Sequence, residues 1–136
     1  MHINKDLPVL LDHDYLQANY HEAGFSYLLP ELLELFRTQS AIYLQSLETL
    51  LGQGNLKGLS EEAHSLKGAA GSVGAAALAE AAQTLENTVK NADIATATAL
   101  VLHLSTLSKL TDSAIIEELE QLAAQQNKSA EGHSSP

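Results

Sequence analysis

Apolar side chains recur at alternating intervals of four and three residues along most of this 136-residue chain. The clearest run, interrupted by one serine, consists of Leu29, Leu33, Phe36, Ser40, Tyr43, Leu47 and Leu50. Such spacing places the side chains on one face of an α-helix, and that face has to be covered by other helices. Val, Ile and aromatic residues, which favour strands, are sparse, and no strand alternation stands out. The spacing therefore predicts an all-α fold.

Residues that end or begin helices divide this pattern into segments. Helices are expected over residues 12–24, from near residue 26 to about 51, over 56–73, over 75–91, and from about 93 onward. The segment 93–126 is compatible with one long helix or with two helices that meet near Thr111-Asp112-Ser113. The sequence predicts an antiparallel, up-down four-helix bundle with an accessory N-terminal helix.

The two ends of the chain differ from this pattern. Residues 1–11 are expected to form an irregular arm, and residues 12–126 the helical-bundle domain. From Asn127 the composition becomes polar and small, which predicts a disordered tail over 127–136. A chain of this length is expected to build one core, and the bundle is complete without a partner, so we expect a monomer.

Composition and charge exclude several classes of function. The net charge is −10 and the seven Lys and Arg residues are scattered, which argues against a nucleic-acid partner. Cysteine is absent, and no histidine pair has metal-ligand spacing, so neither a metal site nor another cofactor is expected. The sequence shows neither a recognisable signal peptide nor an apolar run of the roughly 20 residues needed to span a bilayer. We therefore expect a cytoplasmic protein without membrane contact.

The third expected helix contains an unusual group of residues. Residues advance by about 100° around a helix, so Lys67, Gly68 and Gly71 lie near −60°, +40° and −20° relative to His64. All four share one surface beside the packed face. Each interior glycine costs roughly 0.8–1 kcal/mol relative to alanine, which is plentiful in this chain. We infer that the missing side chains let another macromolecule bring a bulky group close to the imidazole.

The chemistry of these residues suits a phosphoryl group. Imidazole is a nitrogen nucleophile near neutral pH because a substantial fraction is unprotonated. Lys67, one turn from His64, supplies a mobile cation that can hydrogen-bond phosphoryl oxygens. At an exposed site such a contact is worth about 1 kcal/mol, enough for positioning.

The segment Ala63–Gly74, which reads AHSLKGAAGSVG, resembles the signature of histidine-containing phosphotransfer (HPt) domains. In that family the histidine is phosphorylated, the lysine three residues later assists the phosphoryl group, and the following glycine leaves room for the partner. The resemblance implies these roles for His64, Lys67 and Gly68. Gly71 also matches the family pattern, although it is equally compatible with close helix packing or helix termination. The resemblance covers roughly residues 9–110.

This resemblance implies a phosphoryl carrier, not an enzyme. His64 would accept a phosphoryl group from the phospho-aspartate of a response-regulator receiver domain and pass it to another receiver in a two-component phosphorelay. Receiver domains and a hybrid sensor histidine kinase are the expected partners, with Ser60, Gly68 and Gly71 at the contact. Mg²⁺ is expected only on the receiver.

Two other functions remain in consideration. The first is a helical scaffold that binds receiver domains without being phosphorylated. The second is a dimerisation bundle of a histidine kinase, in which an acidic residue usually follows the histidine directly and a proline comes a few residues later. Here Ser65 and Gly68 occupy that neighbourhood and no ATP-binding motif is recognised, which disfavours the second alternative.

Overall fold

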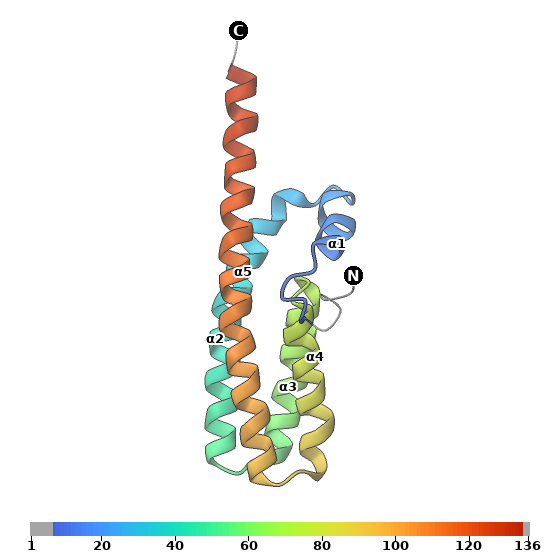
Figure 1. Cartoon of the computed structure of the whole chain (residues 1–136), viewed down its shortest axis with the longest axis vertical. Coiled ribbons are helices and arrows are strands. Elements are labelled where there is room, and N and C mark those ends of the chain that lie inside the picture. Colours follow the sequence, from blue (N-terminus) through green and yellow to red (C-terminus); the bar gives the residue numbers. More distant parts are fainter. Residues whose placement is uncertain (1–6, 135–136) are drawn as a thin grey trace.

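The computed structural model describes residues 7–134, and within them the side chains of residues 7–127. Four long helices run alternately up and down: α2 (Leu29–Gly52), α3 (Leu56–Ser72), α4 (Ala76–Thr88) and α5 (Ile94–Ser134) (Figure 1). A short N-terminal segment lies across one end of this bundle and contains α1 (His13–Leu16), the π-helical turn η2 (Gln17–His21) and the 3₁₀ turn η3 (Ser26–Leu28). The described residues contain no strand. The prediction of an all-α bundle with an accessory N-terminal helix is confirmed.

Capping residues set the ends of α1 and α3 as the sequence indicates. The Asp12 side chain accepts a hydrogen bond from the Tyr15 backbone N–H at the start of α1. Asn55 caps α3 by accepting from the Gly58 N–H, at 2.8 Å. Gly74, with a φ of 74°, turns the chain between α3 and α4 in a conformation that side-chain-bearing residues rarely adopt.

The N-terminal segment departs from the expected single helix over residues 12–24. Only one α-helical turn forms, and the chain then widens into η2 before Gly24, whose φ is 84°. Residues 7–11 are irregular, as expected, but the arm is anchored. The Val9 carbonyl accepts from the Ala77 N–H, and the Asp12 N–H donates to the Gly74 carbonyl, both at 2.8 Å. Residues 1–6 lie outside the described part.

Helix α5 is a single continuous helix, and it extends further than the sequence predicts. It is a single helix through Thr111, whose buried hydroxyl donates to the Leu107 carbonyl at 2.7 Å. It also continues to Ser134, so helix replaces the disordered tail expected over 127–134. A polar composition does not by itself break a helix, and the first proline after Pro30 is Pro136. Residues 135–136 lie outside the described part.

The core is built mainly from leucine and alanine. Leu33, Leu59, Leu85 and Leu104, one from each long helix, are fully buried. The predicted seam of α2 faces inward, with Leu29, Leu33, Phe36, Ser40 and Leu47 buried. Burial of this kind contributes about 25 cal/mol per Å² of apolar surface removed from water. The bundle is therefore held by the face that the four-three spacing identifies.

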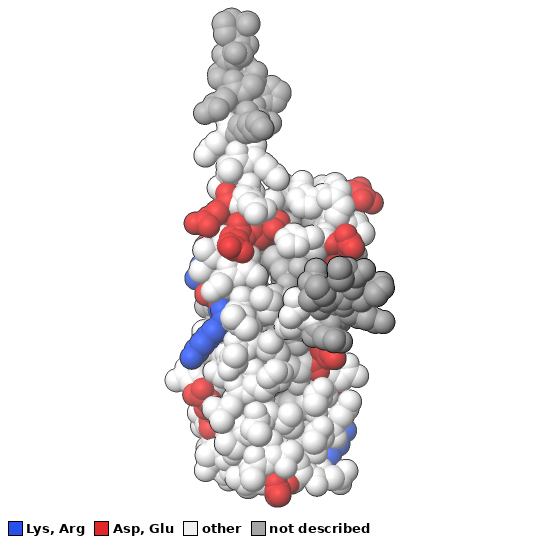
Figure 2. Space-filling view, in the orientation of Figure 1, with Lys and Arg blue, Asp and Glu red and all other residues white. Residues whose placement is uncertain are grey.

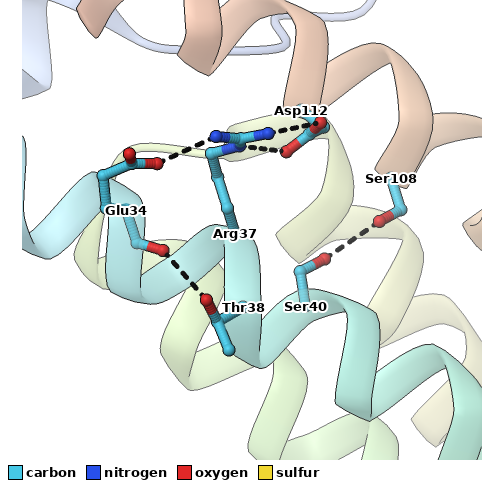
Figure 3. Close-up of polar contacts among 6 residues, drawn as sticks. All are labelled: Glu34, Arg37, Thr38, Ser40, Ser108 and Asp112. Carbon is cyan, nitrogen blue, oxygen red and sulfur yellow. Dashed lines mark hydrogen bonds and ion pairs between the residues drawn. The ribbon is translucent and has the colours of Figure 1, made fainter.

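Polar contacts link α2 to α5 within this largely apolar bundle (Figure 3). The hydroxyls of Ser40 and Ser108 lie 2.9 Å apart in the interior. One turn away, Arg37 donates to Asp112 at 2.7 Å and to Glu34 at 2.9 Å, and these two bonds raise the pKa of the guanidinium. Because an unpaired buried hydroxyl is costly, the serine pair favours one register of α2 against α5.

Helix α5 contains a long apolar stretch, although the sequence does not predict a membrane-spanning run there. Residues 94–127 are long and apolar enough, by length and composition alone, to cross a bilayer. One side of this helix is nevertheless buried against the bundle through Ala97, Val101, Leu104, Leu107, Ile115 and Leu122. The core helix of a bundle passes the same test, so length and composition are weak evidence for a membrane span at α5.

Candidate functional site

His64 stands on the solvent side of α3. Its neighbours in the sequence pattern, Ala63 and Leu66, are fully buried and fix the rotation of the helix. The His64 side chain is 65% exposed. An imidazole in this position is accessible to a partner macromolecule while its backbone is held by the core.

A carboxylate from the neighbouring helix holds the imidazole. Nδ1 of His64 lies 2.8 Å from one oxygen of Glu86 on α4, and the Lys67 ammonium donates to the other oxygen at 3.0 Å. Because an ionised carboxylate can only accept, Nδ1 carries the proton in this pair. In the neutral ring the lone pair is then on Nε2, the nitrogen that Glu86 does not contact.

The same contacts keep Glu86 ionised. The hydrogen bond from Lys67 has the largest effect on the pKa of Glu86, and His64 adds to it; together they lower that pKa against the opposing effect of desolvation. Glu86 therefore remains an acceptor for the imidazole N–H at neutral pH.

Replacing Glu86 with glutamine is expected to remove a pH-dependent part of the stability. Folding lowers the pKa of Glu86 below its ordinary 4.5, so its stabilisation is complete above that pH and is lost as the pH falls through the folded-state value. The difference in unfolding free energy between wild type and Glu86→Gln should be larger at about pH 7 than at about pH 3, as measured by urea unfolding. Glu61→Gln, which changes an exposed carboxylate on α3, is the control. Equal differences at the two pH values would contradict the ion-pair geometry.

Two glycines leave the helix surface bare next to His64. A Cβ built at Gly68 or at Gly71 would meet no atom within 4 Å. Gly58 in the first turn of α3 is the opposite case, because a Cβ there would lie 2.7 Å from Leu50. Close helix packing therefore does not explain Gly68 or Gly71. Helix termination remains an explanation for Gly71, whose carbonyl accepts from the Gly74 N–H at the end of α3.

Ser60 and His64 line a groove between α3 and the end of α4. The Ser60 hydroxyl donates to the Glu86 backbone carbonyl at 3.2 Å, so this residue also links the two helices. The groove has a volume of about 520 Å³ and is lined by Leu56, Lys57, Ser60, Glu61, His64, Glu86 and Lys90. The structure thus brings together His64, Lys67 and Ser60, and it places Gly68 and Gly71 on the exposed surface of the same helix.

Glu86 is the residue that the sequence pattern does not reveal. It follows the buried Leu85 on α4 and is an ordinary acidic residue in its own segment. Its position at the edge of the apolar face of α4 is the only local signal, and that signal does not identify its partner on α3. No group of three or more metal-ligating side chains occurs in the part of the chain that the structure describes.

Comparison with known proteins gives a family match and a structural match. The family model described as Hpt domain matches residues 31–125, more than half of the chain, including all of α3 and α4. The crystal structure of histidine-containing phosphotransfer protein B (HptB) from Pseudomonas aeruginosa PAO1 is 28% identical in sequence. That match covers 82% of this chain and 96% of the other, with a TM-score of 0.74. No curated protein sequence gives a significant match.

Proposed function

Since the chain belongs to the Hpt family, whose members are phosphoryl carriers, we propose that it is phosphorylated on Nε2 of His64 by a receiver domain and then phosphorylates another receiver. The observation that supports this proposal best is that the imidazole of His64 is exposed and its Nδ1 is hydrogen-bonded to Glu86. That contact leaves the other nitrogen available to an incoming phosphorus atom.

The transfer step follows from the protonation state of the imidazole. The Nε2 lone pair attacks the phosphorus, the bond between phosphorus and the aspartate oxygen of the receiver breaks, and the receiver regains its carboxylate. The proton stays on Nδ1, so the phosphorylated ring is cationic and Glu86 stabilises it. In the reverse step an aspartate of the second receiver attacks the phosphorus, and the ring leaves as neutral imidazole. Both directions therefore proceed without moving the proton.

Lys67 and Gly68 have supporting roles in this mechanism. The Lys67 side chain is partly exposed, at 31%, and its flexible stem lets the ammonium move from Glu86 toward the phosphoryl oxygens. Gly68 leaves space above the helix for the active-site loop of the receiver. The receiver supplies Mg²⁺ and most of the charge stabilisation. A hybrid sensor histidine kinase upstream, a monomeric state and a cytoplasmic location belong to the same proposal.

Transfer from a labelled receiver tests the proposal directly. The full chain is mixed with receiver domains of the same cell that carry a labelled phospho-aspartate, and label is expected on this chain in an acid-labile, base-stable form. ATP alone is expected to give no label. Binding of the receivers without any transfer would favour the scaffold and overturn the proposal, and labelling from ATP alone would favour the kinase dimerisation bundle.

A further inference from the structure

The groove beside His64 carries two lysines that the transfer chemistry does not use. Lys57 lies in the first turn of α3 and Lys90 in η4 (Val89–Asn91), directly after α4. Both are exposed and both line the groove. Neither forms an ion pair with any residue in the described part of the chain, whereas Arg37 and Lys67 are both paired.

This concentration of positive charge contrasts with the rest of the protein. The chain has 17 acidic and only seven basic residues, and three of the seven, Lys57, Lys67 and Lys90, lie around His64. On the face shown in Figure 2 basic side chains are sparse, and acidic side chains gather toward the end of the bundle where α1 lies. Two carboxylates, Glu61 and Glu86, also line the groove, so with three lysines the surroundings of His64 carry a net charge of +1, against −10 for the whole chain.

Stability of the helix does not account for Lys57. A cation in the first turn faces the positive end of the helix dipole, which is mildly unfavourable. Lys57 and Glu61 are four residues apart on α3, yet they form no ion pair in this structure. The ammonium is thus left available to a group outside the chain.

The dimensions of the groove suit a side chain that reaches past His64. Lys57 precedes His64 by seven residues, which is about 10 Å along the helix axis. Leu56 provides a half-buried apolar wall, and the lysines provide charge at the end away from Gly68. A macromolecule centred on His64 would cover both Gly68 and this groove.

We propose that the groove of Leu56, Lys57 and Lys90 is a specificity subsite that binds an acidic surface segment of the receiver domain docked on His64. This inference rests on the proposed function and adds to it the chemistry by which a receiver is selected. Complementary charge accelerates encounter and disfavours like-charged partners, whereas the reaction itself takes place at His64. Receivers that carry acidic residues opposite the groove are bound, and receivers with basic residues there are rejected.

Charge reversal tests the subsite. The variant Lys57→Glu/Lys90→Glu is expected to raise the receiver concentration that gives the half-maximal transfer rate (KM) about tenfold at low salt. The maximal single-turnover rate constant should stay within about twofold of wild type. The difference in KM should shrink as salt is raised, because exposed charges are screened. Acidic residues on the receiver surface about 10 Å from the phospho-aspartate are then changed to lysine, one at a time, while the carboxylates that bind Mg²⁺ are kept. One of these changes should restore a low KM with this variant.

Two controls separate the subsite from general effects. Lys109→Glu reverses an exposed lysine on α5 away from the groove and should leave KM unchanged. Lys57→Gln/Lys90→Gln should give an intermediate KM, and circular dichroism should show native helix content in every variant. An unchanged KM in the double reversal, or an equal rise in Lys109→Glu, would overturn the subsite. Absence of transfer to the wild type would instead overturn the proposed function.

Discussion

The His64→Gln variant is expected to show no detectable phosphoryl transfer, while its free energy of unfolding stays close to that of wild type. Glutamine has no nucleophilic nitrogen lone pair, but its amide N–H₂ can still donate to Glu86. The side chain of His64 is 65% exposed, so replacing it leaves no cavity, and surface substitutions of this kind change stability by about 0.5 kcal/mol or less. Labelling from a phosphorylated receiver measures the first effect, and urea unfolding measures the second.

A matched histidine control makes this result specific. His103 is exposed on α5 and lies in a different surface groove, between α5, α4 and the N-terminal arm. His103→Gln should accept label at the wild-type rate. Label that persists in His64→Gln and disappears in His103→Gln would move the phosphorylation site to another helix.

Gly68→Gln is expected to change stability and transfer in opposite directions. Its side chain has open space in the isolated protein, and replacing a glycine inside a helix with glutamine gains roughly half a kcal/mol or more in stability. The same side chain would occupy the surface next to the imidazole where the receiver must approach. We expect transfer from a phosphorylated receiver to fall at least about tenfold, which corresponds to about 1.4 kcal/mol in the barrier.

Another helical glycine distinguishes access from general effects of the substitution. Gly52 at the end of α2 also has no atom within 4 Å of an added Cβ, and it belongs to a different helix. Gly52→Gln should leave transfer unchanged. If Gly68→Gln transfers as fast as wild type, the bare surface is not needed for access. Gly71→Gln measured alongside them shows whether the contact extends one turn further along α3.

The sequence predicts the long helices well because the signals for them are local. The four-three spacing of α2 and the caps at Asn55 and Gly74 depend only on residues within a few turns of each other. The N-terminal segment is less predictable, because a single turn of helix is marginal without its contacts to the rest of the fold. The continuation of α5 past residue 127 is not predicted, because a polar composition is typical of disordered segments as well as of exposed helices.

The same distinction applies to the site. The sequence alone determines which residues share a surface on α3, because this follows from the pitch of a single helix. These residues are His64, Lys67, Gly68 and Gly71. Other features of the site depend on how α3 packs against α4. One is the pair of hydrogen bonds from His64 and Lys67 to Glu86. The other is the groove that Lys57 and Lys90 border. Periodicity shows which face of a helix is buried, but it does not specify which residues of two buried faces lie opposite each other. The packed core sets that register, and only the tertiary structure contains it.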